Sequence, residues 1–179
     1  DHDRDQIQSL CEGIRKILID AREGKKSKSH LAVRLRNRQE IEGLKVGILV
    51  SELETQLKGG YSVGIFVNFV ETHRSIRQII REKFEDMNFS QIIGGQTAVE
   101  RLKQLEAFQE NKNKIMIAMV TAGGVGIGMH DILGTSPRYA LISPPESATQ
   151  TVQCIGRMNR IGGKSNSVQR IIFIKGTIE

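Results

Sequence analysis

The chain has 179 residues, which suits one domain or one domain with a short appendage. Hydrophobic residues make up 39% of it, enough to build a core of that size, so wholesale disorder is excluded. The 26 Lys and Arg outnumber the 20 Asp and Glu, and the resulting net charge of +6 suits a phosphate-rich partner without requiring one.

The patterns of cysteine, histidine and hydropathy exclude further classes of protein. Cys11 and Cys154 show no CxxC spacing and the four histidines no metal-ligand spacing, so neither a zinc site nor a disulfide framework is expected. No apolar run approaches the roughly 20 residues of a membrane helix, and no signal peptide opens the chain. We therefore expect a soluble, intracellular protein without membrane partners. Because no initiator Met is present, we also expect a fragment of something longer.

The first 60 residues predict two amphipathic helices joined by a basic stretch. Apolar residues recur at helical spacing over residues 5–23, and Gly24 ends that pattern. The basic stretch over residues 25–38 is interpreted as a solvated loop, with a contact to a nucleic-acid backbone as the alternative. A second helix is indicated by a single apolar stripe that Gly59 and Gly60 close: Val46, Leu49, Val50, Leu53 and Leu57.

From residue 61 onward, strands and helices alternate. Short apolar runs predict buried strands over residues 63–67, 89–93, 115–120, 139–142 and 168–174. The helix after the second strand is expected to turn Val99, Leu102, Leu105 and Phe108 inward. Thr97 with Glu100, and Ser147 with Gln150, predict capping boxes at two helix starts. This alternation implies an α/β fold with a parallel sheet, helices on both faces, and ligands at the carboxyl ends of the strands.

Glycines cluster after the predicted strands, which points to bound phosphates, but two phosphate-binding motifs fail. Gly163-Lys164-Ser165 lacks the earlier glycine of a Walker A loop, since Met158 stands there, and the flanking helix and strand come in the wrong order. A dinucleotide-binding GxGxxG pattern begun at Gly124 or Gly126 ends on Met129 or Asp131. Both motifs are rejected.

Three segments in order resemble the C-terminal lobe of superfamily 2 helicases. Residues 63–69 resemble the motif IV strand, residues 121–128 resemble motif V, and residues 153–160 fit the motif VI pattern Gln-x-x-Gly-Arg-x-x-Arg in full. Residues 160–179 are similar to the tail of Swi/Snf-type translocases, so the resemblance covers roughly residues 43–179. It implies a RecA-like second lobe over residues 43–179, preceded by an N-terminal helical extension over residues 1–42.

The resemblance also implies roles for individual residues. Arg157 and Arg160 would be catalytic arginine fingers for ATP held by a first RecA-like lobe, which would also hold Mg²⁺. Contacts to ATP are implied for Gln153, Gly126 and Asp131. Contacts to a DNA or RNA backbone are implied for Asn68, Gly94, Gly95, Gln96, Thr121, Gly123 and Gly124.

Elementary chemistry supports these roles. Gln153, Arg157 and Arg160 are spaced four and three apart, which places them on one face of a continuous helix, with Val152 and Ile155 toward the sheet. Guanidinium forks match phosphate oxygens, and an arginine finger contributes about 10³- to 10⁵-fold in turnover. The loop over residues 94–97 opens a helix whose N-terminus suits an anion, with a plain tight turn as the alternative.

Departures from the family pattern keep alternatives open. Gly156 and Ser143–Ser147 stand where Swi/Snf proteins usually have Asp and an Asp-x-Trp-Asn-Pro segment, so a remodelling role is not implied. A duplex-DNA translocase and an unwinding helicase both fit. With neither a Walker A loop nor an Asp-Glu-x-His/Asp strand end, the chain is expected to hydrolyse nothing alone. The competing hypothesis is a catalytically inactive RecA-like module that binds nucleic acid or a partner. A hairpin that docks a partner is an alternative interpretation of the first 40 residues.

Overall fold

The computed structural model describes residues 28–122 and 128–175, together with single positions between residues 9 and 19. Those single positions are helical, but most of the helix predicted over residues 5–23 lies outside the described residues. The same holds for Gly123, Gly124 and Gly126, so the contacts predicted for these three glycines are not described.

Five parallel strands form one sheet in the order β2-β3-β1-β4-β5. Their bounds are β1 Ser62–Val67, β2 Phe89–Ile92, β3 Ile115–Met119, β4 Arg138–Ile142 and β5 Ser167–Ile171. β1 is the central strand, and its Val63 pairs in register with Ile115 of β3 and Tyr139 of β4. Every residue of β1, β3 and β4 is buried, as continuous apolar runs predict for strands covered on both faces. The predicted parallel α/β sheet is confirmed.

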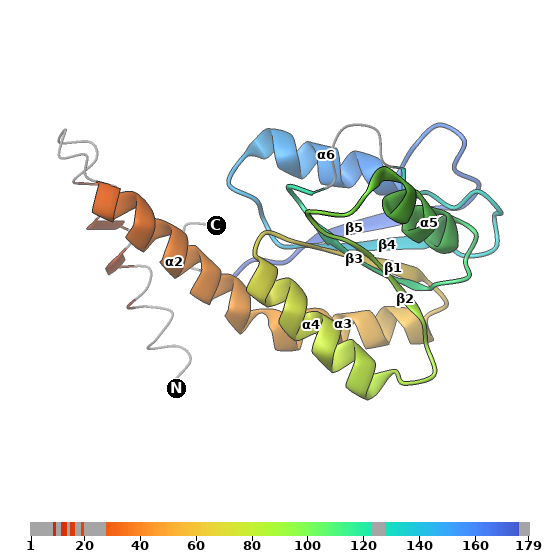
Figure 1. Ribbon diagram of the computed structural model, residues 1–179, viewed down its shortest axis with the longest axis horizontal. Helices are drawn as coiled ribbons and strands as arrows, with labels where there is room; N and C mark the ends of the chain where they lie inside the picture. The colour runs from red at the N-terminus through yellow and green to blue at the C-terminus, as the bar shows by residue number, and fades with distance from the viewer. Residues whose placement is uncertain are drawn as a thin grey trace.

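Helices cover both faces of the sheet (Figure 1). α3 (Val46–Lys58) and α4 (Val70–Lys83) pack on one face, where Val63, Ile65 and Val67 of β1 point. α5 (Ala98–Gln109) and α6 (Ala148–Met158) pack on the other, where Phe66 points. The approach of α6 explains a glycine inside a strand, because a Cβ added at Gly64 would overlap the terminal methyl of Met158.

A further helix, α2 (Lys28–Leu44), replaces most of the loop predicted over residues 25–38, and the loop prediction is wrong from residue 28 onward. α2 extends outward from the sheet (Figure 1) and meets α3 at Lys45. Its C-terminal part is integral to the core, since Ile41 and Glu42 are 0% and 1% exposed. The predicted division at residue 42 thus falls inside a helix, and it stays a prediction.

The two predicted capping boxes differ in outcome. At the start of α5, Glu100 N donates to Thr97 Oγ1 at 3.2 Å and Thr97 N donates to Glu100 Oε2 at 2.8 Å, so this box is confirmed. At the start of α6, the N-cap residue Ser147 makes no side-chain cap hydrogen bond, and the prediction is wrong. α6 therefore begins without a local cap, and its starting point must be set by other contacts.

The inward stripe predicted for α5 is half right. Leu105 and Phe108 are buried, whereas Val99 and Leu102 are 78% and 55% exposed. The helix contacts the sheet through its second half, and its first turns remain outside the core. None of the helices in the described part of the chain is both long and apolar enough to cross a membrane.

Candidate functional site

The strand ends named by the sequence meet at one edge of the sheet. Asn68 follows β1, Thr121 follows β3 and Ser143 follows β4, and these three strands are adjacent and parallel. α6 begins beyond this edge and packs against β4. Asn68, Thr121 and Ser143 therefore lie at the carboxyl edge of the sheet, as expected of strand ends in a parallel sheet. From this edge α6 runs back along the sheet, so that Met158 near its end packs over Gly64 of β1.

α6 is rotated relative to the prediction. Its buried residues are Cys154, Arg157 and Met158, while Val152 is 67% exposed and Ile155 only partly buried. Arg157 is 6% exposed, and its guanidinium carbon lies 6.0 Å from the centroid of the Phe66 ring. The predicted inward position of Val152 is wrong because Cys154 and Met158, one turn apart, form the stripe that packs on the sheet.

Arg160 lies outside the helix. α6 ends at Met158 with Asn159 as its C-cap, so Arg160 does not share a helix face with Gln153, and that prediction is wrong. Both Gln153 and Arg160 are exposed. A Cβ built on Gly128 would lie 3.4 Å from Arg160 Cδ, which places the Arg160 stem beside the last residue of the motif V segment.

Backbone hydrogen bonds join the end of motif V to motif VI. Met129 N donates to the carbonyl oxygen of Arg157 at 2.7 Å. Gln109 Nε2 donates to the carbonyl oxygen of Gly128 at 2.8 Å, which ties the same segment to the end of α5. The two arginines and residues 128–129 thus form one connected unit.

The electrostatics of this unit favour an anion. Burial lowers the pKa of Arg157, an effect that the Cys154 thiol opposes and the neighbouring Arg160 charge reinforces. Burial also lowers the pKa of His130, with Arg160 and Arg138 adding to the shift. Two guanidiniums near one another, one of them desolvated, are stabilised by a phosphate group between or beside them.

Asp131, which the resemblance assigns to ATP, is engaged by its own loop and by Asn111 after α5. It is 1% exposed, and its carboxylate accepts from Asn111 Nδ2 at 3.0 Å, Leu133 N at 3.1 Å and Ser136 N at 2.9 Å. Burial alone would raise its pKa, but these hydrogen bonds outweigh burial and lower the pKa to about 2. The ATP contact stays a prediction, and the observed contacts are those of a residue that holds a turn.

Arg138 is a central residue that the sequence analysis missed. It is 0% exposed and donates to the carbonyl oxygens of Phe108, Gln109 and Met129, each at 3.0 Å. Burial lowers its pKa to about 10, and the nearby Asp131 carboxylate opposes the shift. Arg138 therefore fixes the end of α5 and the segment after motif V, which no local pattern in the sequence indicates.

Asn68, predicted to contact nucleic acid, is engaged with Glu42 of α2. Its Nδ2 donates to Glu42 Oε2 at 2.6 Å and to the carbonyl oxygens of Ser143 and Pro144 at 3.3 and 3.2 Å. Its backbone N–H also donates to the Glu42 carboxylate, at 3.0 Å. Glu42 was not predicted as a site residue, because a charged side chain is ordinarily expected at the surface. The nucleic-acid contact of Asn68 stays a prediction.

The loop before α5 has the geometry of a tight turn. Gly95 has a φ of +84°, and Gln96 closes the turn by accepting from Ile93 N at 2.9 Å and donating to Gln91 O at 3.1 Å. The carboxylate of Glu100 occupies the helix N-terminus. Gly94 and Gly95 remain exposed, as does Thr121 after β3. Their predicted contacts to a nucleic-acid backbone are neither confirmed nor contradicted.

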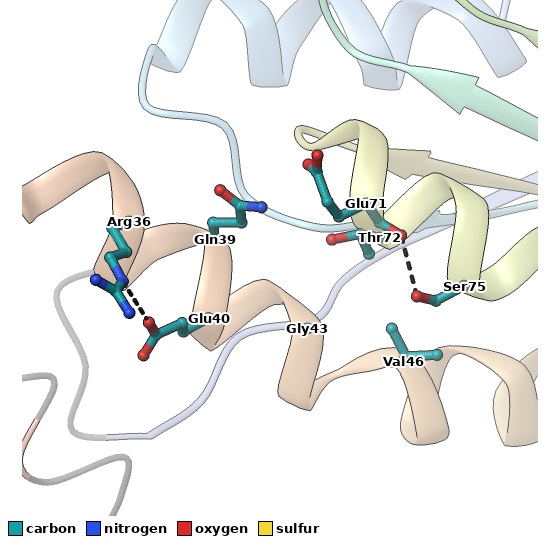
Figure 2. Close-up of a pocket in the computed structure, with 8 residues that line it drawn as sticks. All are labelled: Arg36, Gln39, Glu40, Gly43, Val46, Glu71, Thr72 and Ser75. Carbon is teal, nitrogen blue, oxygen red and sulfur yellow. Dashed lines mark hydrogen bonds and ion pairs between the residues drawn. The ribbon is translucent and has the colours of Figure 1, made fainter. Parts of the chain in front are cut away.

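A separate hollow of about 640 Å³ lies between α2, the start of α3 and α4 (Figure 2). Its wall includes the Arg36–Glu40 pair at 3.1 Å and Ser75, whose hydroxyl donates to Glu71 O at 3.0 Å. Because α3 and α4 lie on the face opposite α6, this hollow is distinct from the two arginines. Within residues 28–122 and 128–175, no group of His, Cys, Asp and Glu side chains could hold a metal ion.

Comparison with known proteins agrees with this architecture. Residues 44–162 match the model of the helicase conserved C-terminal domain. A protein of Acanthamoeba polyphaga mimivirus, named as a candidate ATP-dependent RNA helicase, is 37% identical over 173 residues, or 96% of this chain and 31% of the relative. The Mus musculus DNA excision repair protein ERCC-6-like is 28% identical over 141 residues, or 77% of this chain and 11% of the relative.

Solved structures show the same fold at low identity. The Sulfolobus solfataricus SWI2/SNF2 ATPase core in complex with dsDNA has a TM-score of 0.63 and 19% identity, covering 95% of this chain and 38% of that one. Domain 2 of the DEAD-box helicase Mss116p bound to an RNA duplex has a TM-score of 0.57 and 20% identity, covering 73% and 50%. The chain spans 31% of the length of the mimivirus relative. It therefore belongs to the helicase conserved C-terminal domain family and has the RecA-like fold of that lobe.

Proposed function

We propose that this chain is the second lobe of an ATP-dependent nucleic-acid helicase or translocase, in which Arg157 and Arg160 act on ATP bound by another lobe. The names of its relatives support this proposal, since the mimivirus protein is named for ATP-dependent RNA helicase activity. The observation that carries the proposal is the connection between motif VI and the end of motif V. Met129 N donates to Arg157 O at 2.7 Å, and the Arg160 stem lies beside Gly128.

The two arginines have different parts in this proposal. Arg160 is exposed beyond the end of α6, so its guanidinium can reach a phosphate presented from outside the lobe. Arg157 is buried against Phe66 and contributes a desolvated positive charge behind it. Charge that develops on the transferred phosphoryl group in the transition state is stabilised by such preorganised cations. Gln153, exposed on α6, would contact the nucleotide beside them.

The chain's own residues fit ATP but not Mg²⁺. The cationic pair at the end of α6 suits phosphate oxygens, whereas the part of the chain that the structure describes has no acidic cluster for a cation. The first lobe would hold Mg²⁺ together with most of the nucleotide. Bound ATP would supply the free energy that closes the cleft between lobes, and this lobe would then shift along DNA or RNA.

Contacts to nucleic acid are proposed at the strand-end loops. Thr121, Gly94 and Gly95 are exposed, and no neighbour within 4 Å would obstruct an added Cβ on either glycine. A phosphate backbone could therefore approach these loops closely, which would position the strand without reading its sequence. DNA and RNA both fit this description.

Substitution of Arg160 by Ala in the two-lobed protein tests the proposal. We expect ATP turnover to fall at least about 10³-fold while nucleotide affinity changes only a few fold, because the finger acts chiefly in the transition state. Arg74→Ala on α4 is the matched control, since Arg74 is equally an exposed arginine but lies on the opposite face of the sheet. Turnover within a few fold of wild type in the Arg160 variant would remove the finger assignment.

A further inference from the structure

The loop that leads into α6 is held by contacts with residues distant in the sequence. It runs from Ser143 to Ser147, contains two prolines, and ends at an N-cap whose side chain makes no cap hydrogen bond. An uncapped helix start leaves its first backbone donors without a local partner and tends to fray. The position at which α6 begins must therefore be fixed from outside the loop.

One stripe of α2 supplies several of those contacts, and Asn68 adds two more, from Nδ2 to the carbonyl oxygens of Ser143 and Pro144. Arg34, Arg38 and Glu42 are spaced four residues apart, so they lie on one face of that helix. Arg34 forms an ion pair with Glu146, and Arg38 donates to Glu146 Oε2 at 3.2 Å and to Pro144 O at 3.4 Å. Glu42 Oε2 accepts from the Ser143 hydroxyl at 2.7 Å. Each of these partners lies between the end of β4 and the start of α6.

Glu42 anchors the stripe to the sheet. Its carboxylate is 1% exposed and also accepts from the backbone N–H groups of Asn68 and Phe69, each at 3.0 Å. It therefore joins the end of β1, the first residues before α4 and the end of β4. A buried carboxylate held by several donors fixes geometry far more strongly than solvated ion pairs do.

We propose that α2 is a positioning element for α6: the stripe of Arg34, Arg38 and Glu42 sets the loop Ser143–Ser147 and thereby the placement of the arginines at the end of α6. Part of the N-terminal extension predicted over residues 1–42 thus belongs structurally to the lobe. The catalytic consequence rests on the function proposed above, whereas the structural coupling can be measured without it.

Amide hydrogen exchange of the 179-residue chain tests the coupling directly. The probes are the amides from Thr151, which donates to Ser147 O at 3.2 Å, to Cys154. Glu146→Gln and Arg38→Gln should each speed their exchange about twofold to fivefold, since partly exposed pairs contribute up to about 1 kcal/mol. Glu42→Gln should speed it about tenfold or more, because it removes charge-assisted hydrogen bonds from a buried site.

Arg36→Gln is the matched control. Arg36 is on the same helix and pairs only one turn away, with Glu40 at 3.1 Å, so its loss should leave α6 exchange unchanged. The amide of Val63, which donates to Lys114 O at 2.8 Å in the sheet, reports whether a variant is destabilised globally. If Glu42→Gln unfolds the domain, the Glu146→Gln and Arg38→Gln variants still test the proposal. Exchange at residues 151–154 equal to that of Arg36→Gln in both would overturn the proposal.

ATP turnover of the two-lobed protein tests the consequence for catalysis. Glu146→Gln should lower kcat about threefold to tenfold with KM for ATP changed less than twofold, because displaced arginines weaken transition-state contacts. Glu146→Asp, which keeps a negative charge facing both Arg34 and Arg38, should lower kcat less than Glu146→Gln does. An unchanged kcat alongside faster exchange would overturn the positioning role only. Absence of turnover in the wild-type two-lobed protein would instead refute the proposed function.

Discussion

Arg157 and Arg160 show how neighbouring residues of one type acquire different chemistry from their surroundings. Arg157 is 6% exposed and lies over Phe66, whereas Arg160 is exposed beyond the helix end. A desolvated guanidinium keeps its charge and makes the local potential strongly positive, while an exposed one can move to meet a ligand. The pair thus combines a buried charge with an exposed one, and under the proposed function the exposed arginine would meet a nucleotide held by another lobe.

His73 carries a residue-scale prediction about pH. It is 0% exposed on α4, and burial, reinforced by the Arg77 charge, lowers its pKa to about 4. In the unfolded chain a histidine titrates near about 6.5, so between these values only the unfolded state binds the proton. The free energy of unfolding should therefore decrease by roughly 3 kcal/mol in total as pH falls from about 6.5 to about 4.

Urea unfolding of wild type and His73→Phe across this pH range measures the effect. Phe cannot take up a proton, so the difference between the two stability curves isolates His73 from the carboxylates that also titrate. We expect the Phe variant to gain stability relative to wild type as pH falls. Parallel curves from pH 7 to pH 4 would show that the imidazole is not desolvated as the structure describes.

At the scale of the element, α5 and α6 begin in different ways. α5 is capped by its own Thr97 and Glu100, so its start is encoded within four residues. α6 has no such cap and is reached through a loop that α2 holds. The start of the helix that carries the proposed catalytic group is therefore set by tertiary contacts, which other parts of the protein can shift.

Capping variants test this contrast. Thr97→Ala should lower the free energy of unfolding by about 1 kcal/mol, the usual cost of losing an N-cap side chain. Ser147→Ala, at the N-cap of α6, should cost less than about 0.3 kcal/mol, because no side-chain cap hydrogen bond is lost there. Equal costs at the two positions, measured by urea unfolding, would contradict the assignment of one capped and one uncapped helix.

Helices and strands were predictable from the sequence where nearby residues determine them. Apolar runs gave all five strands, and their alternation with helices gave the parallel sheet. The rotation of α6 was not predictable, because it depends on Met158 packing over Gly64, a residue distant in the sequence. Arg160 was placed on a helix that in fact ends two residues earlier.

The candidate site, too, could be predicted from the sequence only in part. The sequence pattern indicated the strand-end positions Asn68 and Thr121, and the structure places them on adjacent parallel strands. Arg157 and Arg160 lie at the far end of α6, beside residues 128–129. The sequence pattern could not reveal Glu42, whose partners Asn68 and Ser143 lie 26 and 101 residues away. Nor could it show that Asp131 and Arg138 are engaged in fixing the segment after motif V. Burial of a charged side chain depends on partners that only the folded chain brings together.

At the scale of the whole molecule, the described part of the lobe presents the arginines at the end of α6 and exposed loops after β2 and β3. The chain belongs to the helicase conserved C-terminal domain family, and we propose that it works beside another lobe. Under the proposed function, hydrolysis would depend on closure of the cleft between the two lobes. Nucleic acid that spans both lobes would favour the closed state and so stimulate turnover.

ATP turnover, measured for the 179-residue chain alone and for the two-lobed protein, tests this account most directly. Each is assayed without nucleic acid and with single-stranded DNA, duplex DNA or RNA. We predict no turnover by the chain alone under any condition, and turnover by the two-lobed protein that rises with at least one of the nucleic acids. Hydrolysis of ATP by the isolated chain would contradict the claim that its arginines serve a nucleotide held elsewhere.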